Sequence, residues 1–157
     1  MKKQLPALAV SLAIVFAAAV LGGIGSREAP VLYAQFRLPP WAPPAGVFGP
    51  VWTLLYTMMG VAAWLVWRTP GRHTAALTLY AVQLAVNVAW SWFFFAARNG
   101  VLASMDVVLM LALVAATTVA FWRVRPLAGA LLLPYLAWVS FATALTIVVW
   151  QLNPGML

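Results

Sequence analysis

The chain has 157 residues, of which 66% are hydrophobic and only 7% are charged. Soluble domains carry about 25% charged residues, so this composition excludes a water-soluble domain, and the absence of cysteine excludes disulfide frameworks, thiol nucleophiles and cysteine-ligated metals. The net charge of +7, from nine Lys and Arg residues against Glu28 and Asp106, indicates membrane orientation on so apolar a chain, rather than binding of nucleic acid.

Charges and turn residues divide the chain into five apolar segments, each near the roughly 20 residues that an α-helix needs to cross a bilayer. Short connections between four of them make consecutive helices antiparallel neighbours. We therefore predict an all-α fold, an integral membrane bundle of five transmembrane helices forming one domain over residues 1–157. The expected helices span residues 5–25, 47–67, 74–97, 101–122 and 127–150.

The first segment has two readings. Lys2 and Lys3 followed by an alanine-rich run resemble a secretory signal peptide. The apolar run continues through Ile24, however, beyond the apolar region of a typical signal peptide. We expect a first helix that is kept.

The first connection is longer than the others, running from Ser26 to Gly46 and carrying four prolines around Trp41. A connection of that length is usually functional. Cations give the orientation, because Lys2, Lys3 and the arginines at 68, 72, 123 and 125 outnumber those at 27, 37 and 98 on the other side. Six against three places the N-terminus in the cytoplasm and the proline-rich loop outside.

Asp106 is the acid nearest to a predicted helix, close to the start of the fourth. A carboxylate in a first turn is stabilised by the helix dipole, and we expect it to anchor the helix there and to pair with Arg98. A role in proton coupling is the alternative.

Several classes of membrane protein are excluded by missing side chains. Both lysines stand at the N-terminus, which excludes a retinal Schiff base in mid-membrane. His73, the sole histidine, falls in a loop, so we expect no bis-histidine haem and no catalytic metal site. What remains is a bundle that binds something apolar, flat or aromatic.

Nine tryptophans are the strongest compositional feature. Indole prefers the boundary between lipid and water. That role suits the four tryptophans near segment ends, Trp41, Trp67, Trp122 and Trp150. It suits Trp90 and Trp138 less well, because both lie well inside their segments, and Trp52 is intermediate.

Helical spacing places aromatic and polar side chains on shared faces. These faces are Trp52, Tyr56 and Met59 on the second helix; Gln83, Asn87 and Ser91 with Trp90 and Phe94 on the third; and Pro134, Trp138, Phe141, Ala142 and Leu145 on the fifth. A mid-membrane amide should face the bundle interior, because lipid offers it no partner. Whether Gln83 and Asn87 bridge helices or contact a ligand stays open at this point.

A stripe of small residues marks another face of the third helix, where Ala81, Ala85 and Ala89 lie about 200° from the polar stripe. Such stripes let a neighbouring backbone approach closely, as in membrane dimers. We expect a dimer interface here. Ala9, Ala13 and Ala17 form a comparable run on the first helix, and internal packing would explain either stripe.

Four motifs together resemble the translocator protein family (TspO/MBR, the tryptophan-rich sensory proteins, formerly the peripheral benzodiazepine receptor). They are residues 39–44 (PPWAPP), residues 48–56 (FGPVWTLLY), Gln83-Leu84 with Asn87 and Trp90-Ser91, and residues 134–138 (PYLAW) with 141–143 (FAT). The resemblance spans nearly the whole chain, and we expect a bacterial member in a bacterial cell membrane.

The resemblance implies a homodimer with a cavity among the helices, capped by the first loop. It implies porphyrin ligands (protoporphyrin IX or haem), sterols in eukaryotes, and synthetic isoquinoline carboxamides or benzodiazepines, with no required cofactor. Trp52 and Trp138 would serve light-dependent porphyrin breakdown in the manner of bacterial members. The implied ligand contacts are Tyr33, Pro43, Trp52, Tyr56, Asn87, Trp90, Trp138, Ala142 and Leu145.

Two departures from the family pattern matter. Leu38 stands where the family often has a lysine, and Ala144 to Ile147 replace a Leu-Asn followed by aromatics. The C-terminal sterol motif is also missing, so we do not expect sterol transport. Three functions follow as hypotheses, namely a porphyrin receptor or carrier that modulates tetrapyrrole levels or stress signalling, a light-dependent porphyrin-degrading enzyme, and a small exporter of hydrophobic compounds.

Overall fold

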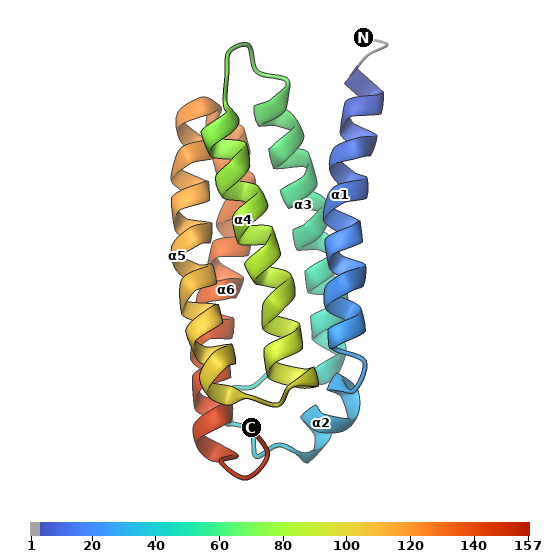
Figure 1. The fold of residues 1–157 in the computed structure, drawn as a ribbon, viewed down its shortest axis with the longest axis vertical. Helices are drawn as coiled ribbons and strands as arrows, with labels where there is room; N and C mark the ends of the chain where they lie inside the picture. Colours follow the sequence, from blue (N-terminus) through green and yellow to red (C-terminus); the bar gives the residue numbers. More distant parts are fainter. Residues whose placement is uncertain (1–3) are drawn as a thin grey trace.

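The computed structural model describes residues 4–157 and is helical throughout its regular structure (Figure 1). Five of the helices are long and apolar enough to cross a membrane, which confirms the predicted fold class. The long helices are α1 (Gln4–Gly25), α3 (Phe48–Trp67), α4 (Thr74–Ser91), α5 (Gly100–Val124) and α6 (Pro126–Leu152); the short elements are α2 (Ala29–Gln35), the 3₁₀ turn η1 (Ala45–Val47) and the π-helical turn η2 (Trp92–Ala96).

The long helices pack as a ring in the order α1, α3, α6, α5, α4, and back to α1. Most consecutive helices are neighbours, as the short connections predict, but α3 and α4 are an exception. Their connecting loop is short, yet both pack mainly on other helices, and α1 lies beside each of them (Figure 1). The N-terminal helix thus completes the wall between two helices that follow each other in sequence.

Glycines set the closest helix contacts. Gly60 of α3 faces α1, where an added Cβ would lie 2.8 Å from the side chain of Leu12, and the Ser11 hydroxyl donates a hydrogen bond to the Gly60 carbonyl at 2.7 Å. On α6, a Cβ at Gly129 would lie 2.7 Å from Cα of Trp122 on α5. Small residues therefore allow close contact between α3 and α1 and between α6 and α5.

The predicted helix over residues 74–97 does not stay α-helical to its end. From Trp92 it widens into η2, where the Ala97 N–H donates to the Trp92 carbonyl at 2.7 Å. Phe94 is buried by this turn and stacks on Trp90, with ring centroids 5.2 Å apart. Such π-helical turns are rare in proteins overall, but those that occur are often found at functional sites.

The first connection contains a helix, α2, that the sequence did not predict. Together with its flanking loops, α2 lies across the end of the bundle that also holds the C-terminus (Figure 1). The Asn153 carboxamide accepts from the Arg37 N–H at 2.8 Å and donates to the Arg37 carbonyl at 3.0 Å. The Tyr33 hydroxyl donates to the Pro43 carbonyl at 2.7 Å. These bonds hold the loop over the bundle end.

The predicted pairing of Asp106 with Arg98 is wrong. The Arg98 guanidinium donates instead to Glu28 Oε2 at 2.7 Å, which joins the α1–α2 connection to the start of α5. Asp106 lies beyond the first turn of α5, so the helix dipole acts on it weakly. It is buried, and its Oδ2 has no hydrogen-bond partner among residues 4–157.

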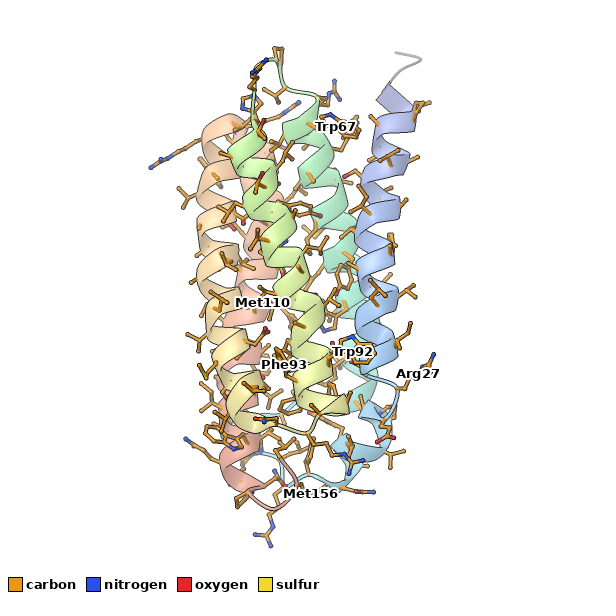
Figure 2. The ribbon with its side chains drawn as sticks, viewed as in Figure 1. Arg27, Trp67, Trp92, Phe93, Met110 and Met156 are labelled. Atoms are coloured by element: carbon orange, nitrogen blue, oxygen red, sulfur yellow. The ribbon has the colours of Figure 1, made fainter. Side chains whose placement is uncertain are left out.

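The tryptophans divide nearly as predicted. Trp41, Trp67 and Trp122 are about half exposed, and Figure 2 shows Trp67 at the end of the bundle opposite Arg27. Trp150 is the exception among the expected boundary residues. It packs against Gly100, where a Cβ would collide with the indole, and so it fills the contact between α5 and α6.

Candidate functional site

A cavity of about 380 Å³ lies inside the half of the bundle that α2 covers. Its volume falls within the range of roughly 300–1,000 Å³ that is usual for small-molecule sites. The wall is predominantly apolar, and none of its side chains is an Asp, Glu, Lys, Arg or His. Its aromatic members are Tyr33, Phe36, Phe48, Trp52, Tyr56, Trp90, Phe94, Phe95 and Trp138.

The cavity gathers all but one of the residues named for ligand contact from the sequence. Pro43 does not line it, and its carbonyl instead accepts the hydrogen bond from Tyr33. The Tyr33 phenol is protonated at neutral pH and can donate this bond, and burial raises its pKa further. The residues that do line the cavity are Tyr33, Trp52, Tyr56, Asn87, Trp90, Trp138, Ala142 and Leu145.

The aromatic wall is held by ring contacts between different helices. Trp52 of α3 lies 5.4 Å from Tyr56 on the same helix and 6.2 Å from Tyr135 of α6, measured between ring centroids. Trp138 of α6 meets Phe48 edge to face at 5.9 Å. Such pairs add about 0.5–1.5 kcal/mol each beyond the burial of their area. These contacts restrain the orientation of the rings that face the cavity.

A buried chain of hydrogen bonds stands behind this wall. The Tyr56 hydroxyl donates to Asn87 Oδ1 at 2.6 Å, the Asn87 amide donates to the Tyr135 hydroxyl at 2.9 Å, and Tyr135 donates to Gln83 Oε1 at 2.8 Å. Gln83 and Asn87 of α4 thus bridge to α3 and α6, as one of the two alternatives left open by the sequence predicts, and ligand contact by Asn87 stays a prediction. Asn87 also lines the cavity, whereas Gln83 does not.

Two indole donors on the cavity wall are unmatched. Nε1 of Trp90 and Nε1 of Trp138 are buried, and neither has an acceptor among residues 4–157. An indole N–H can only donate, and a buried donor without a partner costs about 1–3 kcal/mol. Both nitrogens are fully covered by protein atoms, so the surface that the cavity offers suits a largely apolar, aromatic molecule.

Other side chains named from helical spacing lie outside the cavity. Met59 is fully buried in the core, and Phe141 packs behind the wall against Trp138 and Trp41. Ala81 and Ala85 are exposed on the outer face of α4, while Asn87 of the same helix faces inward. The structure thus agrees with the angular separation of the small and polar stripes.

Sequence reasoning placed Tyr33 of α2 on the cavity wall but missed the rest of the wall that α1 and α2 contribute. Gly22, Gly23 and Ser26 of the α1 end line the cavity together with Ala29 and Pro30 of α2. A Cβ at Gly23 would meet nothing within 4 Å, because it points into open space. The adjacent glycines near the end of this alanine-rich helix were the available signal. Met110 of α5, labelled in Figure 2, was also missed.

Metal binding has no support from the side chains present. Within the part of the chain that the structure describes, no three His, Cys, Asp or Glu side chains gather closely enough to hold a metal ion. The chemistry available in the cavity is stacking, apolar contact and donation of a few hydrogen bonds.

Comparison with known proteins identifies the family of this chain. The profile of the TspO/MBR family matches residues 9–151. The chain belongs to the TspO/MBR family. Its five membrane-crossing helices make it a multi-pass integral membrane protein of that family.

Relatives in this family come from mammals and bacteria. The chain is 47% identical over 127 residues to the human translocator protein, covering 78% of this chain and 75% of the relative. It is 37% identical over 158 residues to the tryptophan-rich protein TspO of Chlorobaculum tepidum, covering 98% of this chain and 100% of the relative. It is 36% identical over 143 residues to protein CrtK of Rhodobacter capsulatus, covering 88% and 89%. The bacterial origin expected from the sequence stays a prediction.

Proposed function

We propose that this protein is a membrane receptor or carrier that binds porphyrins, such as protoporphyrin IX or haem, in the cavity and so modulates tetrapyrrole levels or stress signalling. The observation that carries the proposal is an uncharged, largely aromatic cavity with Trp52, Trp90 and Trp138 on its wall. A flat tetrapyrrole gains from stacking on such rings and from apolar burial.

The propionates of protoporphyrin are charged and cannot be buried without partners. They are therefore expected to face the cavity mouth. Arg27 supports this orientation, because it is exposed and stands in the chain between Ser26 and Ala29, both of which line the cavity. Neutral aromatic amides of the isoquinoline carboxamide or benzodiazepine type suit the same uncharged, aromatic cavity.

A second function, light-dependent breakdown of the bound porphyrin, is favoured by the position of two oxidisable side chains. Trp52 and Trp138 line the cavity from different helices, so a bound porphyrin would contact both. The porphyrin would supply the photochemistry, and the protein would orient it and exclude competing reactions.

Titration of purified protein in detergent with protoporphyrin IX, in the dark and under illumination, tests both functions. Saturable binding with unchanged porphyrin in the light supports the receptor alone. Loss of porphyrin absorbance that depends on the protein supports the second function. Trp67→Phe is the matched control, because Trp67 is exposed at the opposite end of the bundle (Figure 2). Absence of saturable binding in the dark would refute the proposal.

We also propose a homodimer through Ala81, Ala85 and Ala89, and a cytoplasmic N-terminus in a bacterial cell membrane. The exposure of Ala81 and Ala85 on the outer face of α4 supports the first point. The excess of cations at the α3–α4 and α5–α6 loops supports the orientation.

A further inference from the structure

A groove between α5 and α6 opens on the outer surface of the bundle, at the end opposite the ligand cavity. Its α5 wall is one stripe with the helical spacing i, i+3, i+4, i+7, i+8, and its α6 wall is formed by two leucines. Val119, Trp122 and Leu133 are 51%, 46% and 46% exposed, so the groove faces the lipid of a surrounding bilayer. The lining residues are Ala115, Thr118, Val119, Trp122, Arg123, Leu133 and Leu136.

We propose that this groove binds an anionic phospholipid, with one acyl chain along the stripe and the phosphate at Arg123. The stripe from Ala115 to Arg123 is about 12 Å long at 1.5 Å per residue. That length is close to half of the roughly 30 Å hydrocarbon core, the depth of one leaflet. Arg123 stands in the last turn of α5, at the aqueous end of the stripe, where a lipid headgroup would be.

The groove combines an apolar floor with a cationic end. The Thr118 hydroxyl donates to the Val114 carbonyl at 2.8 Å and so offers the groove no free donor. Close packing of Gly129 under Trp122 places the α6 backbone against α5 at this point, while the indole stays partly exposed beside Arg123. An anionic phospholipid matches both parts of the groove, its acyl chain the apolar floor and its acidic headgroup the cationic end.

Charge complementarity selects an anionic lipid over a neutral one. Four arginines lie at this end of the bundle, at positions 68, 72, 123 and 125, whereas Glu28 and Asp106 lie toward the other end. Glu28 is already paired with Arg98, and no ion pair involving Arg123 is formed within residues 4–157. Basic side chains beside transmembrane helices attract acidic headgroups, and residues 4–157 supply Arg123 with no acidic partner.

Native mass spectrometry of the full chain, released from vesicles of equal parts phosphatidylcholine and phosphatidylglycerol, tests the proposal. The parent protein should retain phosphatidylglycerol in preference to phosphatidylcholine. Arg123→Gln should lower the relative retention of phosphatidylglycerol about fivefold, the equivalent of about 1 kcal/mol for one arginine at a membrane surface. Arg123→Lys keeps the charge and should keep most of the preference.

Two further variants separate the groove from general surface charge. Arg72→Gln removes an equal charge from an exposed arginine at the same end but outside the groove, and should change the preference less than twofold. Ala115→Phe fills the inner end of the groove and should lower the retention of both lipids; Val119→Phe, at an exposed position, repeats this test if the first variant fails to fold. An equal loss in Arg72→Gln and Arg123→Gln, or full retention in a folded groove-filling variant, would overturn the proposal.

Discussion

The Asn87 carboxamide accepts from the Tyr56 hydroxyl and donates to the Tyr135 hydroxyl, which makes Asn87→Leu a sensitive test of the buried chain. The substitution keeps the side-chain size but removes both bonds. Hydrogen bonds between membrane helices average about 0.6 kcal/mol, which gives about 1.2 kcal/mol for two. Tyr135 still donates to Gln83, but the buried Tyr56 hydroxyl loses its acceptor, and an orphaned buried group costs about 1–3 kcal/mol. The expected loss of stability is therefore about 1–3 kcal/mol.

The double variant Asn87→Leu with Tyr56→Phe distinguishes this account from a simple packing effect. Tyr56→Phe removes the buried hydroxyl that has lost its acceptor, so the double variant should be more stable than Asn87→Leu alone. Unfolding by SDS in mixed micelles, followed by circular dichroism, measures Asn87→Leu, Tyr56→Phe and the double variant against the parent. If the two losses simply add, the Tyr56–Asn87 bond contributes nothing and the reasoning fails.

Three further results are expected. Trp52→Phe and Trp138→Phe should weaken porphyrin binding by about 1 kcal/mol or less. They should slow any light-driven loss of porphyrin absorbance much more, because phenylalanine is far harder to oxidise than indole. Degradation at the parental rate would show that these tryptophans serve only in packing. Ala85→Leu should force the α4 helices of a dimer apart and reduce crosslinking in membranes, whereas undiminished crosslinking would place the interface elsewhere. A C-terminal reporter that is active only in the cytoplasm should be silent, and an active one would invert the proposed orientation.

Much of the site could be predicted from helical spacing. The i, i+4 spacing of Trp52 and Tyr56 and the inward phase of Asn87 follow from the geometry of a single helix, and the structure places all three on the cavity wall. The partners of these residues could not be predicted in the same way. That Asn87 joins Tyr56 to Tyr135, which is 48 residues further along the chain, depends on how three helices meet.

The sequence by itself determined the membrane-spanning helices, because the length and hydropathy of each segment act locally on the chain. Only the tertiary structure decided that α1 lies beside both α3 and α4, that α2 covers one end, and that Arg98 pairs with Glu28 instead of Asp106. Each of these depends on contacts between segments far apart in sequence. The neighbours of α1 depend on close approaches such as that of Gly60 on α3 to α1, and the ion pair depends on which loops meet at one end of the bundle.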